Sequence, residues 1–239
     1  MRTASVLVAT AVLLAVAAPA GAQARVEGNP QWWCEVAESF DRLARVRTYR
    51  MRMTPSAGTA GVGSSVWEFA HAGPARASRM VTRWSQGGRE FQVETVQIGN
   101  DVWQRTSGPA GTQVRWVKLQ APPASLPGPW DPARPQDVGA GTVRMLSKAA
   151  GTHRTPRGQV RAVYVYEFQV QRPGAVTVHN SLAVDRQTGL PLRLTIRSAE
   201  GGGPAGPAGP GIAPPQAFTM EYYDHGAAIR ITVPAGCPR

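Results

Sequence analysis

Hydrophobic residues recur at two different spacings along the chain, and the change between them predicts where a helix is followed by strands. Asn29 suits a helix N-cap, and Pro30 stands at the first helical position. Apolar residues then recur at every third or fourth place through Ala44, which predicts one amphipathic helix over about residues 30–47. From Tyr49 the spacing changes to two, as in a strand with one buried face.

Alternation with a period of two dominates the rest of the chain and predicts about ten or eleven strands. Short turn signals such as Gly99-Asn100-Asp101 separate the runs, so neighbours in sequence are expected to pair as antiparallel hairpins. The closing pair is expected at residues 218–222 and 229–233, with a turn at 224–226. The apolar side of the strands is rich in methionine and large aromatic rings. These residues are Tyr49, Met51, Met53, Trp67, Phe69, Met80, Trp84, Tyr166, Phe168, Met220 and Tyr222.

Three segments interrupt the alternation. Residues 120–141 are rich in proline, which lacks the hydrogen-bond donor of a central strand, so a loop or lid is expected there. Residues 138–149 suggest a short helix, although Gly139 and Gly141 disfavour one. Residues 201–214 contain Gly-Pro-x triplets in too short a run for a collagen helix, and we expect a surface loop.

Many consecutive antiparallel strands with one apolar face each are expected to form one large curved sheet, in a single mainly β (α+β) domain over residues 25–239. The inner face of this sheet can be covered only by one clear helix, one doubtful helix and a proline-rich segment, which is too little to cover all of it. The methionine and aromatic residues of that face are therefore candidates to line a cavity for an apolar ligand. They equally suit a filled core, and periodicity does not distinguish the two.

The first 24 residues have the pattern of a cleaved secretory signal peptide. Arg2 supplies the positive start, residues 6–18 the apolar run, and Ala20-Gly21-Ala22 or Ala22-Gln23-Ala24 the cleavage site. The apolar run is too short for a membrane span, and no cysteine follows for lipid attachment. We therefore expect a periplasmic or secreted protein that is not lipid-anchored.

Export changes how cysteine and charge are interpreted. In an oxidising compartment Cys34 and Cys237 favour a disulfide over a metal site or a reactive thiol, and closing so long a loop is worth on the order of 5 kcal/mol in the chain-entropy model. The formal net charge of +11 comes almost entirely from arginine, since only Lys118 and Lys148 are lysines. An exported chain without a recognition motif is not expected to bind nucleic acid.

Three hairpins resemble those of a known superfamily. Residues 183–193, with the sequence AVDRQTGLPLR, resemble the Val-Asp-x-x-Thr-Gly-Leu-Pro-x-Arg hairpin of the LolA-like outer-membrane lipoprotein carriers and the related LppX/LprG-type lipid-carrying lipoproteins. Residues 96–105, VQIGNDVWQR, resemble their central hairpin. Residues 222–226, YYDHG, followed by 229–234, IRITVP, resemble their closing hairpin. The order of elements is similar over nearly the whole mature chain.

The resemblance implies an open antiparallel half-barrel of about eleven strands, with an N-terminal helix and a helical or proline-rich lid. It implies a periplasmic carrier that holds the acyl chain of a lipid or lipoprotein, without catalysis and without a cofactor. Burial alone suffices for such binding, because each buried methylene contributes about 0.8 kcal/mol. The implied partners are a lipid or acylated lipoprotein and envelope proteins, with peripheral contact to a membrane. Unlike the LppX/LprG branch, the chain has no cysteine to acylate.

Four arginines flank the inner-face aromatic residues along the predicted strands. Arg50 and Arg52, with Arg79 and Arg83, are candidates to meet anionic head groups, because the guanidinium fork matches phosphate. A solvated outer face would give the same alternation.

Motifs for catalysis and for metal binding are missing from the sequence. It has no Gly-x-Ser-x-Gly elbow, and its four histidines are isolated, so neither an enzyme nor a metal site is expected. The carboxylates Glu90, Glu94 and Glu167 are expected to face water. Two alternatives remain open: a filled sheet protein that acts as an envelope regulatory or protein-interaction module, and an enzyme whose site is assembled only by the fold.

Overall fold

The computed structural model describes most of the predicted domain. The described residues are 24–55, 64–72, 75–86, 88–108, 115–119, 141–172, 177–198 and 217–234, with the backbone alone for 55, 64–72, 75, 76, 86 and 198. The predicted signal peptide, the 201–214 loop and all but the end of the proline-rich segment lie outside these residues.

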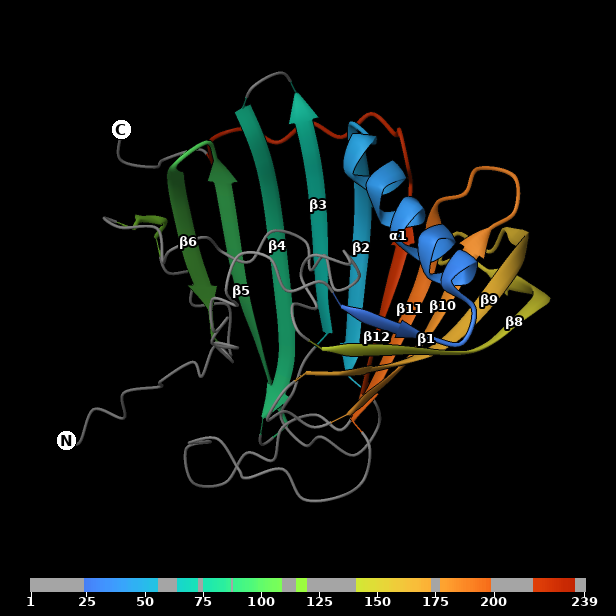
Figure 1. The fold of residues 1–239 in the computed structure, drawn as a ribbon. Coiled ribbons are helices and arrows are strands. Elements are labelled where there is room, and N and C mark those ends of the chain that lie inside the picture. Colours follow the sequence, from blue (N-terminus) through green and yellow to red (C-terminus); the bar gives the residue numbers. More distant parts are fainter. Residues whose placement is uncertain are drawn as a thin grey trace.

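The described chain is mainly β: one helix packs against a single open sheet of twelve strands (Figure 1). The first half contains β1 (Arg25–Glu27), α1 (Pro30–Arg45), β2 (Thr48–Pro55), β3 (Ser64–Ala72), β4 (Ala75–Gln86), β5 (Arg89–Ile98), β6 (Asp101–Ser107) and β7 (Val117–Lys118). The second half contains β8 (Thr142–Arg154), β9 (Val160–Gln171), β10 (Val178–Asp185), β11 (Pro191–Ser198) and β12 (Ala217–Tyr223).

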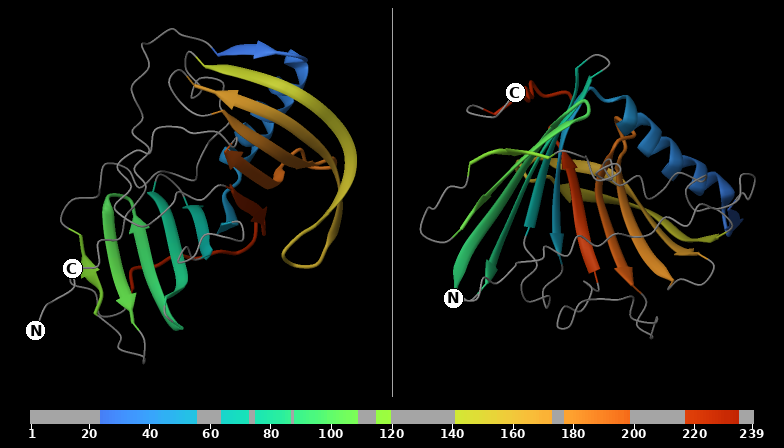
Figure 2. Two further views of the ribbon diagram at one scale, coloured as in Figure 1. Left: turned by 90° about the horizontal axis from the view of Figure 1, so that it is seen from below. Right: turned by 90° about the vertical axis from the view of Figure 1, so that its left-hand side faces the viewer.

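Two antiparallel meanders build the sheet. Strands β2 to β7 pair in sequence order, as do β8 to β12, and β12 pairs with β2 to join the two sets. The short β1 adds a parallel edge beside β8. The sheet curves strongly without closing on itself (Figure 2), which confirms the expected mainly β, open architecture with an N-terminal helix.

Helix α1 forms for the reasons its sequence indicates. The Asn29 side chain accepts a hydrogen bond from the backbone N–H of Gln31 at 3.0 Å, and Pro30 follows the cap. The helix ends before Val46, with Arg42 and Arg45 in the last turn, where cations complement the helix dipole. Its buried stripe has three- and four-residue spacing. It consists of Trp33, Val36, Phe40 and Leu43.

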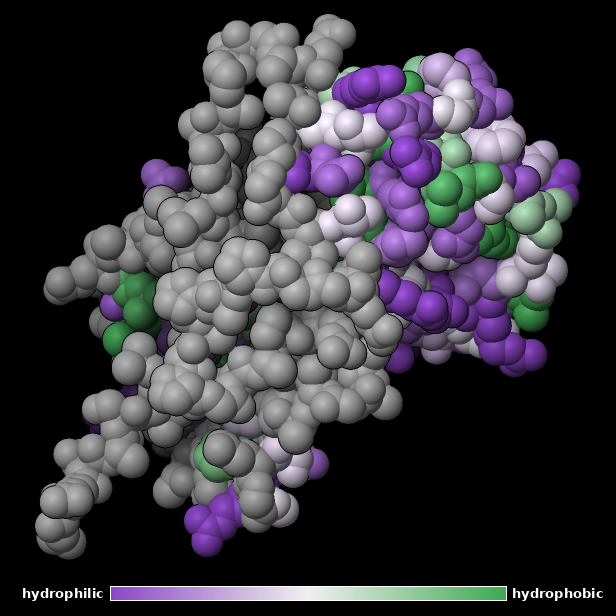
Figure 3. Space-filling view, turned by 60° about the horizontal axis from the view of Figure 1, so that its bottom comes forward, coloured by the Kyte–Doolittle hydropathy of each residue, from purple (hydrophilic) through white to green (hydrophobic). Residues whose placement is uncertain are grey.

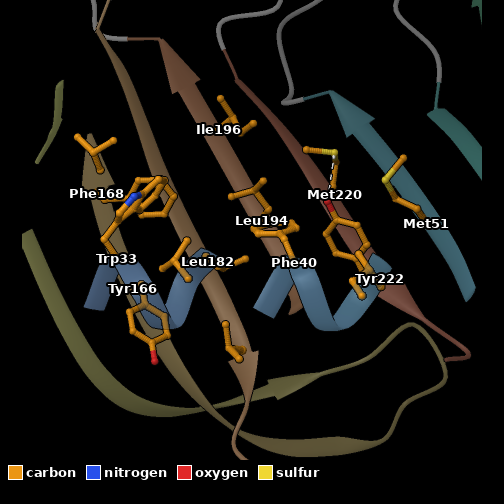
Figure 4. Packing of buried hydrophobic residues seen from close by; sticks show 14 of the residues in the cluster. Trp33, Phe40, Met51, Tyr166, Phe168, Leu182, Leu194, Ile196, Met220 and Tyr222 are labelled. Carbon is orange, nitrogen blue, oxygen red and sulfur yellow. Dashed lines mark hydrogen bonds between the residues drawn. The ribbon is translucent and has the colours of Figure 1, made fainter. Parts of the chain in front are cut away.

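This stripe packs on the inner face of the sheet and forms the main hydrophobic core (Figure 4). The Trp33 and Phe168 rings meet edge to face with centroids 5.6 Å apart, and Phe40 meets Tyr222 in the same way at 6.3 Å. Each fully buried large side chain contributes about 1.5–3 kcal/mol. The sheet supplies Tyr49, Met51, Val143, Met145, Tyr166, Phe168, Leu182, Val184, Leu194, Ile196, Met220 and Tyr222.

The prediction of a helix at residues 138–149 is wrong for the described residues of this range. Residues 142–154 form strand β8, which pairs along its whole length with β9. Val143 and Met145 are buried, while Arg144 between them is exposed, so the local pattern has a period of two. Pairing with β9, which buries Val143 and Met145 in the core, outweighs the weak helical preference of this segment.

The prediction of a strand at residues 229–233 is also wrong. After the turn at 224–226 the chain runs without strand structure through residue 234. The reason lies in the topology: β12 has β11 on one side and β2 on the other, so neither of its edges is free to accept a closing hairpin partner.

The turn between β10 and β11 anchors the far end of α1. Asp185 accepts hydrogen bonds from the backbone N–H groups of Gln187 at 2.7 Å and Thr188 at 3.0 Å. Gly189 has φ +69°, and a Cβ at this position would lie 3.1 Å from the Arg42 side chain, closer than ordinary van der Waals contact. Arg42 also donates to the Thr188 carbonyl at 3.4 Å. The glycine thus meets both a backbone and a packing requirement.

Replacing Gly189 with alanine is expected to lower the free energy of unfolding by about 1.5–2 kcal/mol, because a Cβ strains the left-handed backbone and forces the Arg42 side chain to shift. Gly158→Ala is the matched control: Gly158 has φ +81° and open space around it, so about 1 kcal/mol is expected from the backbone alone. Denaturant unfolding of both variants measures the difference. Equal losses would contradict a packing role for Arg42.

Candidate functional site

Six of the candidate cavity-lining residues are buried in the core beneath α1, and this part of the inner face is filled. Met53 lies at the margin of the same core, half-buried. In the view of Figure 3 the described surface around this half is mostly hydrophilic, with hydrophobic residues only in small groups. The six residues are Tyr49, Met51, Tyr166, Phe168, Met220 and Tyr222.

The other candidates lie on strands that extend beyond the helix. Trp67 and Phe69 belong to β3, and their side chains lie outside the described set. Met51 pairs directly with Trp67, and Trp67 pairs directly with Met80. Because directly paired residues lie on the same face of a sheet, Trp67 and Met80 belong to the same inner face as the buried Met51. Met80 and Trp84 on β4 are half-buried. The structure therefore divides the predicted lining into a filled part and a part on β3 and β4.

Near the hairpin that joins β4 and β5, the inner face carries half-buried apolar side chains, with the hydroxyl-bearing Thr82 between Met80 and Trp84. Trp84 stacks on Phe91 of β5, with ring centroids 5.5 Å apart and planes 12° from parallel. Val93 continues this face beside Phe91 and is half-buried as well. Figures 1 and 2 show β4 and β5 extending away from α1, which lies over the β8 to β12 half. We define Met80, Trp84, Phe91 and Val93 as the inner apolar strip.

A polar cluster fastens the first turns of α1 to the sheet. Glu35 accepts hydrogen bonds from Lys148 Nζ at 2.6 Å and from the Tyr166 hydroxyl at 2.7 Å. Burial by itself raises the pKa of Glu35, but these two donors outweigh it and hold the pKa below its ordinary value. Lys148 also lies over the Tyr164 ring, 4.5 Å from its centroid.

Sequence reasoning missed this cluster because of a register shift. The pairing of β8 with β9 shifts between Met145 and Ser147, which places Lys148 opposite the inward-facing Tyr166. Before the shift, odd-numbered residues of β8 face the core. No periodicity in the sequence marks the change.

Arg50 and Arg52 lie on the outer face of the sheet, away from the core. Arg50 donates to Asp224 at 2.6 Å, and Arg157 from the β8–β9 hairpin donates to the same carboxylate at 2.8 Å. The hydrogen bond from Arg157, and then that from Arg50, hold the pKa of Asp224 below its ordinary value despite its partial burial. Arg52 lies over the Tyr223 ring at 5.9 Å.

Arg79 and Arg83 also lie on the outer face. Arg83 donates to Gln92 at 2.9 Å, and Arg79 donates to Glu94 at 2.7 Å. Glu94 receives a second arginine, Arg105, at 2.6 Å. The expectation that Glu94 faces water is wrong: its side chain is 4% exposed and bridges two cations. Arg105 in turn covers the Trp116 ring at 4.9 Å.

His225 lies in the turn after β12, beside an apolar recess of about 530 Å³ at the end of α1. Burial lowers the pKa of His225 to about 4, although Asp185 and Asp224 act in the opposite direction. Its ring lies 6.4 Å from the ring of Tyr49, and its Nε2 has no hydrogen-bond partner within the part of the chain that is described. The recess is lined by Val46, Arg47, Thr48, Leu190, His225, Gly226 and Ala227.

Cys34 is exposed on α1, whereas Cys237 lies outside the described residues, so the disulfide stays a prediction. Within the described ranges no three His, Cys, Asp or Glu side chains are grouped to hold a metal ion. No helix there is long and apolar enough to cross a membrane.

Comparison with known proteins does not identify a family. Neither a protein-family model nor a curated protein matches the chain. The resemblance to the lipoprotein carriers therefore depends on the three hairpin strings and on the order of the elements.

Replacing Glu94 with glutamine is expected to lower the free energy of unfolding by about 2 kcal/mol, because Arg79 and Arg105 lose their shared counter-charge while both keep partial contact with water. Glu90→Gln on the same strand, at an exposed position, should change it by less than about 0.5 kcal/mol. Denaturant unfolding checks both values. A neutral effect of Glu94→Gln would contradict the bridging role.

Neutral His225 is expected to make stability depend on pH. Its pKa is lower in the fold than in the unfolded chain, so the unfolded state takes up the proton first and stability falls as the pH decreases from about 6.5 to about 4. The loss from this group should reach roughly 3 kcal/mol. His225→Phe should flatten the slope in that interval, as measured by unfolding at several pH values. An unchanged slope would contradict the assignment.

Proposed function

We propose that the chain is an exported, non-catalytic binding protein that holds the acyl chain of a lipid or lipoprotein against the inner apolar strip. It would belong with the half-barrel carriers that its hairpins resemble, without a cofactor. The observation that supports this proposal is the division of the inner face: one part is filled by α1, while the strip on β4 and β5 is apolar and half-buried.

The strip suits an acyl chain because of its chemistry. Its members are a methionine, a valine and two stacked aromatic rings, which offer adaptable apolar area without charge. Burying about ten methylenes yields roughly 8 kcal/mol, which is comparable with the cost of association. Useful affinity therefore requires a long chain, and the binding energy should grow with its length.

Helix α1 covers the other part of the inner face, and polar contacts hold this helix in place. Glu35, Lys148 and Tyr166 fasten the first turns of α1, and Arg42 fastens its last turns to the turn at Thr188 and Gly189. With α1 held at both ends, the filled core stays closed. In this proposal the cargo occupies the strip beside the helix and leaves the core beneath it intact.

A protein-interaction module with the same fold is the second candidate. The observation that favours it is the filled core beneath α1, which takes up six residues first considered for a cavity. In that case the apolar strip would meet a protein partner in the envelope, and no lipid would bind.

A fatty-acid series tests the proposal on the purified, delipidated protein. Displacement of a fluorescent fatty acid should show that each added methylene tightens binding about fourfold, because about 0.8 kcal/mol is gained per methylene. Val93→Glu should weaken binding at least tenfold, because it places a charge against the acyl chain.

Gln92→Glu is the matched control, since it adds the same charge on the same strand but on the outer face, beside Arg83. Its affinity for fatty acids should equal that of the parent, and both variants should keep the circular dichroism of the parent. Binding that ignores chain length, or equal effects of the two substitutions, would exclude the acyl-chain proposal. A parent protein that binds no fatty acid at all would favour the interaction module.

A further inference from the structure

Within the described residues, seven arginines gather at one end of the sheet, where α1 ends, β2 begins and β10 and β12 both finish, beside an eighth, Arg154, at the end of β8. They come from separate parts of the chain: the last turns of α1 and the residues after it, the start of β2, the β8–β9 hairpin, and the turn after β10. We call them the arginine rim. They are Arg42, Arg45, Arg47, Arg50, Arg157, Arg161 and Arg186.

Contacts across the rim show that these segments meet. Arg50 and Arg157 share the carboxylate of Asp224. The backbone N–H of Arg186 donates to the carbonyl of Ala162 at 3.0 Å, which ties the turn after β10 to the base of the β8–β9 hairpin. Figure 2 shows this hairpin curling round toward the end of β12.

The rim carries an excess of positive charge. In the part of the chain that is described, four carboxylates lie among the seven arginines: Glu38 pairs with Arg42, Asp224 is shared by two arginines, and Asp185 Oδ1 accepts hydrogen bonds from backbone N–H groups of its own turn. The fourth is Asp41, exposed on α1. Arg45, Arg47 and Arg186 are exposed, and within the described residues none of the three forms an ion pair.

An apolar recess opens in the middle of this charge. Its walls include Val46, Leu190 and Ala227, and Arg47 stands among them. An apolar recess with Arg47 in its wall, between segments that carry the other arginines of the rim, matches the two parts of a phospholipid, since the fork of arginine pairs with phosphate and the recess accepts hydrocarbon. An acidic protein surface would match the charge but would leave the recess without a partner.

We propose that the arginine rim docks the protein on the surface of a bilayer that contains anionic phospholipid. This goes beyond the proposed function and does not depend on it, because docking requires no cargo on the inner apolar strip. Each arginine near an anionic surface strengthens binding about fivefold, through an attraction that salt screens within about 10 Å.

Vesicle co-sedimentation of the purified full chain tests the proposal. The protein should bind vesicles of phosphatidylcholine mixed with phosphatidylglycerol, and it should not bind vesicles of phosphatidylcholine alone. The triple variant Arg45→Gln, Arg47→Gln and Arg186→Gln should bind the anionic vesicles roughly a hundredfold more weakly. Added salt should weaken the binding of the parent.

The control variant removes three arginines away from the rim. Arg89, Arg172 and Arg197 are exposed and lie at or toward the opposite ends of their strands, so Arg89→Gln, Arg172→Gln and Arg197→Gln lower the net charge by the same amount. Binding should stay within about threefold of the parent. Thermal unfolding confirms that both triple variants fold.

Three results would overturn the proposal. Equal loss of binding in the two triple variants would show that total charge, not the rim, attracts the vesicle. Failure of the parent protein to bind anionic vesicles would exclude bilayer docking. Polyglutamate that binds the parent protein more tightly than the anionic vesicles do, through the same three arginines, would assign the rim to an acidic protein partner. Fatty-acid binding to the inner strip is measured separately, so failure of one proposal does not imply failure of the other.

Discussion

The packing of α1 on the inner face of the curved sheet is the contact on which the rest of the structure depends. Trp33, Val36, Phe40 and Leu43 cover an apolar surface that the β8 to β12 strands and β2 build together. A strongly curved open sheet has too much inner face for one helix of 16 residues to cover. The helix therefore closes one half and leaves β4 and β5 extending beyond it, and this asymmetry produces the candidate binding surface.

Charge is arranged around this core in a consistent way. On the outer face two carboxylates, Glu94 and Asp224, each join a pair of arginines, so buried or half-buried acids neutralise part of a very basic chain. Arginine suits such bridges because its planar fork holds carboxylates with defined geometry. Elsewhere, at the end of the sheet, arginines outnumber carboxylates, and the positive charge remains available to a partner of opposite sign.

Local patterns predicted the parts of the fold that depend on neighbours in sequence. The cap at Asn29 and the helical spacing located α1, and alternation located most strands. The predictions that were wrong concern features that depend on distant segments. No strand forms at 229–233 because β12 is already paired on both sides. Glu94 is buried because Arg79 and Arg105, on the two neighbouring strands, form ion pairs with it. The candidate lining residues share one face of the sheet, as their alternation suggested. Which of them are buried in the core depends on where α1 packs, and the alternation does not reveal that.

Native mass spectrometry of the protein purified from a host that exports it tests the proposed function most directly. Organic extraction and lipid analysis of the same sample would identify what co-purifies. An acyl-chain carrier should show a mass above that of the processed chain, with lipid or acylated peptide at one copy per protein, and the added mass should disappear in Val93→Glu. A protein that carries no added mass, and acquires none after incubation with fatty acids and phospholipids, would contradict acyl-chain binding on the inner strip.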